Sequence, residues 1–452
     1  MIDVKIYNTE EQDFKEKPYR YKGGARMSGR QSMLRQMREE MEMSTTTLRQ
    51  IAADFCAAIE ARCRGTESSL QMLPSFLDLP MGKETGCFLA LDFGGTNVRA
   101  MLVQLNGRKS TVLKQQTAPL RTADGKYDYT AKTSSAEELF DFLARLLITV
   151  ADGQQVYSLG HTFSFPCRQI SRSQAELIAW TKEIATPGVE GKEVGGLLQA
   201  ALARHQSRII QTAILNDTVG TLLAAAYQDP TADIGAICGT GHNLCFRHVG
   251  TDLFEPMIYN LESGNFSCLS QNRYDRLVDV ASEKPGAQVM EKMVGGQYLG
   301  EIVRRMALDA VEARILSPQC EQYLSRPYGL TAVDLACFLK PAVSNRTVKL
   351  RGLSVQEEEF LAGLAYLVCR RSARLAAAAL VGVLRYSDPD MLRTHTVGID
   401  GSLYSKLPGY ADWLRAAVNE ILSDQAAALR ITAVQDGSGI GAAIAAAIAS
   451  PK

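Results

Sequence analysis

Two segments of the chain share one pattern of apolar and polar positions. Each begins with an apolar run, passes through a turn containing Gly, Thr and Asn, and continues into a second run of alternating character. The apolar run predicts a buried strand, and the second run predicts a strand that returns beside it. These hairpins cover residues 87–105 and, in a weaker form, 234–249. The recurrence predicts two similar lobes that face one another, each presenting a glycine-rich turn.

Helical periodicity and a further strand fill most of the remaining chain. Helices are predicted from residue 45, where Leu48, Ile51, Phe55 and Ile59 share one side, and over 135–152 and 191–205. A third strand and turn is predicted over 395–404. The longest apolar run, 375–384, has about half of the roughly 20 residues that a membrane span needs. It therefore predicts a buried, closely packed helix, and the whole pattern predicts α/β units around mixed sheets.

Residues 1–43 form a separate, charged and Met-rich segment. Met33, Met37 and Met41 recur every four residues, so they would line one face of a helix. Such a face could bind a partner or a membrane surface, or it could pack on its own protein. We favour packing on its own protein, because apolar stripes of this kind usually face a core.

The composition excludes several classes of protein. The 49 Lys and Arg residues balance the 49 Asp and Glu residues, which argues against a nucleic-acid binder. The hydrophobic fraction of 46% is typical of a globular chain. Ten cysteines without a C-x-x-C pair predict reduced thiols, and the polar N-terminal segment does not resemble a signal peptide. We therefore expect a cytoplasmic protein without membrane insertion.

The two glycine-rich turns suggest phosphate binding. Glycine allows positive φ and lets backbone N–H groups approach an anion, and Thr96 and Thr240 add hydroxyl donors in the same turns. One such turn is weak evidence, because tight hairpins also use glycine for geometry alone. Two turns could hold a polyphosphate from both sides. Asp92, near the end of the first strand, could hold a hydrated Mg²⁺ beside it.

Asp217 lies where an apolar strand becomes an apolar helix, in the segment QTAILNDTVGTLLAAAY. An acidic residue at this point can simply satisfy the free N–H groups and the dipole of the helix. The same position also suits a carboxylate that accepts a proton from a hydroxyl group. The two interpretations are compatible.

The chain resembles the hexokinase family of ATP-dependent sugar kinases. The resemblance rests on ordered motifs from about residue 48 to 450, namely FLALDFGGTNVRAMLVQL, LGHTFSFPC, AWTKEI, LNDTVGT, IGAICGTGHNLCF, YDRLVDVAS, EKMVGGQYLGEIVR, VGIDGSLY and DGSGIGAA. It implies an α/β fold of two lobes, of the actin and sugar-kinase type, with the active site in the cleft between them. The expected divisions are an N-terminal extension (1–43), a large domain (44–81 and 214–438) and a small domain (82–213 and 439–452).

The resemblance also implies a set of site residues. On the phosphate side these are Gly94, Gly95, Thr96, Asn97 and Arg99 in the first turn, Gly239, Thr240 and Gly241 in the second, and Asp400, Gly401 and Ser402 in a turn beside the adenosine. On the sugar side they are Ser164, Thr181, Lys182, Asn216, Asp217, Asn243, Glu262 and Glu291. His242, inside the second phosphate turn, is interpreted as a turn residue that faces the nucleotide cleft.

The implied reaction is transfer of the γ-phosphoryl group of ATP to the 6-hydroxyl of a hexose, expected to be glucose, as the first step of glycolysis. Asp217 would accept the hydroxyl proton, Lys182 would act beside it, and Mg²⁺ with the turn N–H groups would offset charge on the transferring group. We expect a monomer or a homodimer.

One loop departs from the family pattern. Glu262 is followed by Ser-Gly-Asn-Phe-Ser-Cys, where the family usually has Trp-Gly-Ala-Phe-Gly-Asp. The loss of the indole removes packing area beside the sugar carboxylate, which bears on sugar choice more than on the reaction. Two alternatives follow: a catalytically weak sugar sensor on the same fold, and an actin-like ATPase. The sugar-type Glu and Lys residues disfavour the ATPase.

Overall fold

Two β-sheets of similar construction organise the chain. The computed structural model describes residues 29–95, 97–151, 156–181, 184–340 and 353–450. In each sheet three consecutive antiparallel strands are extended by two parallel strands, and the larger sheet has one more short antiparallel strand at its edge. Both predicted hairpins are present, which confirms the repeated pattern and the expectation of two similar lobes.

The small lobe is built on the five-stranded sheet. Its strands, in spatial order, are β4 (Ser110–Pro119), β3 (Asn97–Asn106), β2 (Thr85–Phe93), β5 (Tyr157–Phe163) and β8 (Ile209–Leu215). Helices α3 (Ala136–Val150) and α4 (Val194–Arg204) cover the face that carries Leu89 and Leu91. Ala90 points to the opposite face, as the alternation of a strand requires. A short hairpin, β6 (Cys167–Ser171) and β7 (Gln174–Leu177), lies at the edge.

The large lobe is built on the six-stranded sheet. Its strands, in spatial order, are β1 (Leu73–Pro74), β11 (Met257–Asn260), β10 (His242–His248), β9 (Ala232–Cys238), β12 (His395–Asp400) and β13 (Leu429–Ala433). Its helices are α1 (Gly29–Met41), α2 (Thr45–Cys63), α6 (Arg273–Val280), α7 (Val289–Val294), α8 (Gly296–Glu312), α9 (Glu321–Leu324), α10 (Ala332–Leu339), α11 (Val355–Ser387), α12 (Ser402–Lys406) and α13 (Tyr410–Leu422).

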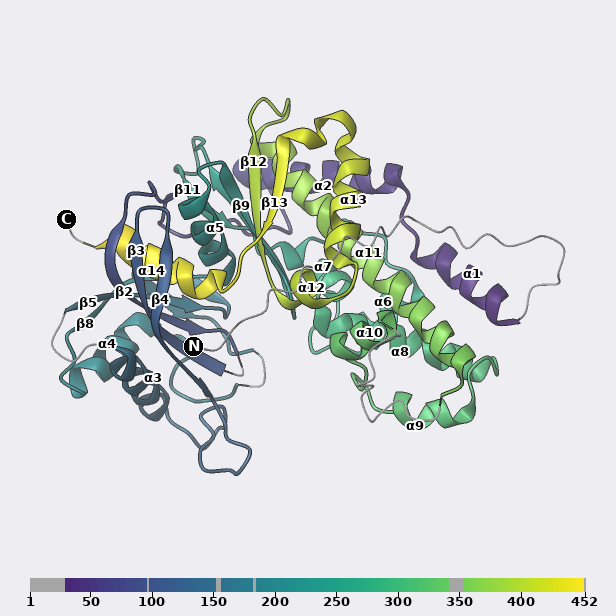
Figure 1. Cartoon of the computed structure of the whole chain (residues 1–452), viewed down its shortest axis with the longest axis horizontal. Coiled ribbons are helices and arrows are strands. Elements are labelled where there is room, and N and C mark those ends of the chain that lie inside the picture. Colours follow the sequence, from purple (N-terminus) through teal and green to yellow (C-terminus); the bar gives the residue numbers. More distant parts are fainter. Residues whose placement is uncertain (1–28, 96, 152–155, 182–183, 341–352, 451–452) are drawn as a thin grey trace, which may run out of the picture.

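The two lobes exchange the helices that follow their last strands. Helix α5 (Asp217–Gln228) follows β8 of the small lobe but packs on β9 and β12 of the large lobe. Helix α14 (Gly437–Ala449) follows β13 of the large lobe but packs on β2, β5 and β8 of the small lobe (Figure 1). The two helices also pack on each other, and a Cβ added to Gly441 would lie 2.0 Å from the carbonyl oxygen of Gly220. Only glycine permits this approach.

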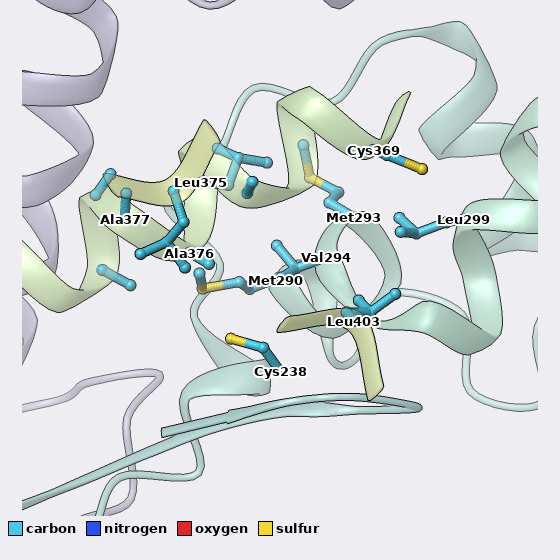
Figure 2. Packing of buried hydrophobic residues seen from close by; sticks show 14 of the residues in the cluster. Cys238, Met290, Met293, Val294, Leu299, Cys369, Leu375, Ala376, Ala377 and Leu403 are labelled. Atoms are coloured by element: carbon cyan, nitrogen blue, oxygen red, sulfur yellow. The ribbon is translucent and has the colours of Figure 1, made fainter. Parts of the chain in front are cut away.

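The large lobe has its own apolar core beneath the sheet. Residues 375–384 of α11 are buried throughout, which confirms the prediction of a closely packed helix. Around Cys238, at the end of β9, α11 contributes Leu375 and α7 contributes Met290 and Val294 (Figure 2). This packing supports the end of β9, from which the second glycine turn begins. Among the described residues, none of the helices combines the length and the apolar character that a membrane span requires.

Helix α1 packs on its own protein. Met37 and Met41 are each 1% exposed, and Met33 packs against the same core. Gly363 of α11 lies so close to Leu34 that an added Cβ would come within 2.9 Å of it. The interpretation of the methionine stripe as a core-facing surface is confirmed, and residues 1–28 of this segment lie outside the described residues.

We expect Gly441→Ala to lower the midpoint of thermal unfolding. Helix propensity alone predicts the opposite, because Ala is about 1 kcal/mol more favourable than Gly in a helix interior. Overpacking against a backbone carbonyl costs about 1–3 kcal/mol, and the 2.0 Å approach places this site at the upper end, so the net loss of stability should approach about 2 kcal/mol. Calorimetry would measure the midpoint. Ala447→Ser, on a partly exposed part of the same helix, is the control and should change it little. A rise for Gly441→Ala would contradict the close helix contact.

Candidate active site

The predicted site residues gather where strands of both sheets end. Phe93, Phe163 and Leu215 end the parallel strands of the small lobe, and Cys238 and Asp400 end two parallel strands of the large lobe. In α/β folds, ligands bind outside the carboxyl ends of parallel strands. The lobe crossing after β8 places the start of α5 at this junction.

Asn216 and Asp217 form the start of α5. Asn216 is the N-cap, and its Oδ1 accepts a hydrogen bond of 2.9 Å from the Thr218 N–H. Asp217 is the first helical residue, and its half-buried carboxylate lies at the positive end of the helix dipole. The capping role that the sequence allowed belongs to Asn216. The side chain of Asp217 also accepts from the Thr218 N–H, at 2.9 Å.

Asn243 joins three segments of the large lobe. Its Oδ1 accepts from the backbone N–H groups of Leu244, at 2.8 Å, and Ser263, at 3.1 Å. Its Nδ2 donates to Asn260 Oδ1 at 2.8 Å, and it lies 3.5 Å from both Asn216 Oδ1 and Glu262 Oε1. One side chain therefore holds the start of α5 near the loop that carries Glu262.

Glu262 adopts a backbone conformation that costs energy. Its φ of 51° and ψ of 49° lie in the left-handed region, which is uncommon for residues other than glycine. Asn260 stabilises this conformation, because its Nδ2 donates to Glu262 Oε1 at 2.7 Å and its Oδ1 accepts from the Glu262 N–H at 3.3 Å. Asn260 is 6% exposed, so this pair of bonds is shielded from water. The half-buried carboxylate of Glu262 is thereby held in one orientation.

Glu291 lies between two glycines of the large lobe. Its Oε2 accepts a hydrogen bond of 2.8 Å from the His242 N–H. A Cβ on Gly241 would lie 2.6 Å from Glu291 Oε1, and one on Gly264 would lie 3.0 Å from Oε2. The glycine after Ser263, which this chain shares with the family pattern, therefore makes room for the second carboxylate.

A small cavity lies between the two lobes, beside Asn216, Asn260 and Glu262. Its volume is about 40 Å³, and Asn216, Asn260 and Glu262 face Phe165 and Cys167 of the small lobe across it. Burial, and then the negative charge of Glu262, raise the pKa of Cys167 to about 12. The shared cavity places Cys167 of the small lobe near this carboxylate.

Asp92 is held by one charged group and one hydroxyl group from two other segments. Its Oδ2 accepts from Arg99 Nη2 at 2.8 Å and from Ser438 Oγ at 2.9 Å. Arg99 also pairs with Asp436, just before α14. Burial lowers the pKa of Arg99, but the two carboxylates outweigh this effect and raise it. The first turn is therefore fastened to the start of α14.

The first glycine turn lies against the FSFP segment. A Cβ on Gly94 would be 3.6 Å from Ser164 Oγ and 3.9 Å from Asp92 Oδ1. Phe93 packs on Phe163, Phe165 and Trp180, whose ring centroids lie 5.1–6.2 Å away. This aromatic cluster supports the segment that continues into Thr181. Among the described residues, no hydrogen bond joins the Thr181 side chain to another predicted site residue.

The second glycine turn meets the turn after β12. A Cβ on Gly239 would lie 3.4 Å from Gly401 Cα and 3.5 Å from the Ser402 nitrogen. Asp400 accepts from the N–H groups of Gly401, at 2.6 Å, and Gly437, at 2.9 Å. Burial raises the pKa of Asp400 in spite of these bonds. Asp400 thus joins β12 to the start of α14.

The remaining predicted residues complete the two turns. Gly95 is buried with a φ of 152°, a value that requires glycine, while Asn97 and Thr240 are exposed. Thr96 and Lys182 lie outside the described residues.

One interpretation from the sequence is wrong. His242 does not face the cleft: it is the first residue of β10 and is 4% exposed, with Nδ1 3.9 Å from Cys238 Sγ. The strand begins two residues earlier than the apolar pattern indicates, so His242 belongs to the strand and not to the turn, and its ring is buried. The sequence also missed Asn260, Asp436 and Ser438. Asp436 and Ser438 lie in the DGSGIGAA motif, which could have marked them as site residues. For Asn260, the sequence offered only its position two residues before Glu262.

The donor set around Asp92 suits a hydrated divalent cation. No described residue donates a hydrogen bond to Asp92 Oδ1, which leaves one carboxylate oxygen for a metal-bound water beside the first turn. Among the described residues, there is no cluster of His, Cys, Asp or Glu that could enclose a metal by itself. Mg²⁺ commonly binds through one or two carboxylates and substrate phosphates while keeping several waters, so an enclosed cage is not required.

Comparison with known proteins identifies the family. Two models, both described as hexokinase, match residues 33–227 and 233–448. The chain belongs to the hexokinase family. It is 33% identical to the rice (Oryza sativa subsp. japonica) protein Hexokinase-9, over 92% of this chain and 89% of that protein. It is 31% identical to Hexokinase-2 of Candida albicans, over 92% of this chain and 91% of that protein.

Solved hexokinases share the fold over nearly the whole chain. A crystal structure of a hexokinase matches with a TM-score of 0.82 and 31% identity, over 93% of this chain and 99% of that one. The hexokinase from Schistosoma mansoni, solved in complex with glucose, matches with a TM-score of 0.78 and 30% identity, over 93% and 100%. The fold is thus the two-lobed sugar-kinase fold. The protein is an enzyme that transfers a phosphoryl group from ATP to a hexose, with a divalent metal.

Asn260 is predicted to position Glu262 for the hexose. We expect Asn260→Ala to raise the KM for hexose about tenfold while the KM for ATP changes little, because removal of a hydrogen bond to a charged group costs about 1.5–3 kcal/mol. Steady-state kinetics with each substrate varied in turn would measure this. Asn419→Ala, on the exposed side of α13, is the control. Equal changes in both KM values would contradict a positioning role toward the sugar.

Two buried histidines predict a loss of stability in acid. Burial lowers the pKa of His161 to about 4, against a smaller opposing effect of Gln211, and it lowers the pKa of His242 to about 4. The unfolded chain, with a His pKa near 6.5, therefore binds more protons than the folded protein between these values. Stability contributed by the neutral rings is present above about pH 6.5 and is lost as the pH falls toward 4.

We expect each ring to contribute about 2 kcal/mol to the loss of stability between pH 7 and pH 5. His161→Leu should therefore show a smaller fall in the unfolding midpoint over this range than the original chain. His205→Gln, at the half-buried C-cap of α4, should retain the full fall. An unchanged pH dependence in His161→Leu would refute the assignment.

Proposed function

We propose that this hexokinase phosphorylates the 6-hydroxyl of glucose, with tolerance for other hexoses, and that Asp217 accepts the hydroxyl proton. The observation that carries the proposal is the hydrogen-bonded group around Asn243, which joins the start of α5 to the Glu262 loop at the cavity between the lobes. Asp217 follows Asn216 directly in this group.

The carboxylates of the cleft suit a ring with several hydroxyl groups. Each hydroxyl has one proton to donate, and carboxylate oxygens accept such bonds well. Glu262 and Glu291 would accept from the sugar hydroxyls, and Asn216 and Asn243 would offer amide groups. Ser164, Thr181 and Lys182 would contact the sugar from the small lobe, with Lys182 also acting beside Asp217 in the reaction.

On the phosphate side, we assign the nucleotide to the two glycine turns. Gly94, Gly95, Thr96, Asn97 and Arg99 would border the phosphates from the small lobe, and Gly239, Thr240 and Gly241 from the large lobe. Asp400, Gly401 and Ser402 would lie toward the adenosine. Asp92 would hold Mg²⁺ through water, and when bound the ion would offset charge on the phosphates.

The altered loop after Glu262 bears on the choice of hexose. Ser263 is fully buried, and its hydroxyl has no hydrogen-bond partner among the described residues. Glycine at 264 and Phe266 keep the carboxylates and the core packing in place without the indole. We therefore expect the loop to modify affinity among hexoses rather than to abolish turnover.

We propose that the large domain comprises residues 44–81 and 214–438, and that the small domain comprises residues 82–213 and 439–452.

All ten cysteines are free thiols, which suits a reducing compartment. We therefore propose a cytoplasmic enzyme. We also propose that it acts as a monomer or homodimer in the first step of glycolysis.

A panel of sugars tests the substrate. ADP release would be measured with glucose, fructose, mannose and N-acetylglucosamine, and without sugar. Glucose should give the highest kcat/KM. Sugar binding without ADP release would favour a sensor, and ADP release independent of sugar would favour an ATPase, so either result would overturn the proposal.

Asp217→Asn tests the base. We expect kcat to fall by about 10²–10⁴, with the hexose affinity nearly unchanged, because general-base catalysis contributes on this scale. A purely structural carboxylate in a first helical turn would affect stability by about 0.3–1 kcal/mol and leave kcat intact. Glu137→Gln, in the first turn of α3, removes a matched charge away from the cleft. Near-normal turnover in Asp217→Asn would refute the assignment.

A further inference from the structure

A second cavity, of about 110 Å³, lies in the large lobe between α1 and α11. It is enclosed by the C-terminal end of α1, the link to α2, and one face of α11. Four arginines line it: Arg38 from α1, and Arg370, Arg371 and Arg374 from α11. It shares no residue with the cavity between the lobes.

The helical spacing places the α11 arginines together. Arg370 and Arg374 are four residues apart, and Arg371 is adjacent, so all three lie on one side of α11. Arg371 and Arg374 are 2% and 5% exposed and form the buried part of the lining. Arg38 is exposed and Arg370 half-buried, which places them toward the opening.

The two buried arginines are only partly satisfied. Both Nη atoms of Arg371 donate to Asp275, at 2.6 and 2.9 Å, and those of Arg374 donate to Glu420, at 2.7 and 2.8 Å. The Nε–H of each is buried and has no hydrogen-bond partner among the described residues. A buried donor left without an acceptor costs about 1–3 kcal/mol, and more when it is charged. These two unsatisfied donors belong to side chains that line the cavity, so the guanidinium charges there are incompletely compensated.

The two outer arginines carry charge that is weakly compensated. Arg370 lies 3.7 Å from Glu42, an exposed contact of little energetic value. Arg38 forms no ion pair with a described residue. Against these four arginines stand the carboxylates of Glu42, Asp275 and Glu420, so the surroundings hold one positive charge in excess.

The end of α1 adds one opposing influence. The free carbonyl groups of a helix C-terminus repel an anion. Arg374 already compensates part of this effect, because its Nη2 donates to the carbonyl oxygen of Met43 at 3.0 Å. The exposed guanidinium of Arg38 and the half-buried one of Arg370 remain available toward the opening.

We propose that this cavity binds a small tetrahedral oxyanion, namely phosphate or the phosphoryl group of a phosphate monoester. Guanidinium groups match such anions through charge and paired N–H donors. Donors from several arginines on two helices suit four oxygens better than the two coplanar oxygens of a carboxylate. The volume exceeds the roughly 10–15 Å³ that one water requires by this measure, so it admits several water-sized atoms.

The bound anion would join α1 to α11. It would contact Arg38 of the first helix and the arginines of the second. The two helices already pack on each other at Leu34 and Gly363, and the Arg370–Glu42 pair and the bond from Arg374 to Met43 join α11 to the link after α1. Binding to the folded state alone raises the unfolding midpoint by mass action. The anion should therefore stabilise the docking of the N-terminal helix.

Thermal unfolding of the full chain in increasing inorganic phosphate tests the site. Sodium chloride would hold the ionic strength constant, and saturating ADP, hexose and a divalent metal would occupy the cleft. We expect a saturable rise in the midpoint. Arg38→Gln combined with Arg370→Gln should weaken phosphate binding about tenfold or more, because each removes a hydrogen bond to a charged group. The substitutions at these outer positions leave the buried ion pairs of Arg371 and Arg374 intact. Because this cavity shares no residue with the cavity between the lobes, kcat should not change.

Arg415→Gln, an exposed arginine on α13, is the matched control and should keep the phosphate-dependent rise. An equal rise in all three proteins, or no rise beyond that in chloride, would overturn the proposal. Glycerol phosphate in place of inorganic phosphate distinguishes the sources: a comparable rise, lost in the double variant, assigns a phosphate monoester, and no rise assigns free phosphate. Activity of the double variant separates this result from any failure of the catalytic assignment.

Discussion

The close contact between α5 and α14 is the constraint on which the rest of the structure depends. Each helix follows the last strand of one lobe and packs on the sheet of the other. At their crossing Gly441 lies against the backbone of Gly220 and leaves no room for a Cβ. Both helices begin at the site, since α5 starts at Asp217 and α14 starts beside Ser438, which donates to Asp92. The spacing between the start of α5 and the start of α14 is therefore set by a backbone contact, which adjusts less readily than side chains do.

Local strain and buried hydrogen bonds then fix the individual groups. Glu262 has a left-handed backbone, and the side chain of Asn260 holds it there. Glu291 occupies space that glycines at 241 and 264 provide. A strained residue persists only where its surroundings determine it, and such positions concentrate in functional sites. The strained backbone of Glu262 lowers the stability of the fold but orients its carboxylate, while the apolar core beneath Cys238 contributes stability.

The sequence predicted the local elements well because their signals are local. Hairpins at β2–β3 and β9–β10, the apolar helix at 375–384 and the stripe of Met33, Met37 and Met41 all depend on periodicity within a short window. The family motifs supplied the site residues, whose roles stay predictions. The exchange of α5 and α14, and the contact of Ser438 with Asp92, join segments far apart in the chain, which periodicity does not record. The buried ring of His242 was missed because β10 begins two residues before the apolar run at Leu244, and strand ends are poorly marked by a pattern of apolar positions.

The chain has no net charge, but its charges are distributed unevenly. The two candidate phosphate sites therefore differ in the sign of their local charge. In the cleft, Arg99 faces both Asp92 and Asp436, so the described charges there are in acidic excess. A polyphosphate binds at an acidic site of this kind together with a divalent cation, whose positive charge offsets the excess of carboxylates. In the cavity between α1 and α11, four arginines exceed three carboxylates and retain unpartnered N–H donors. That balance suits an oxyanion without a metal. A net charge of zero is therefore compatible with two ways of binding phosphate, because each depends on the few groups that face it.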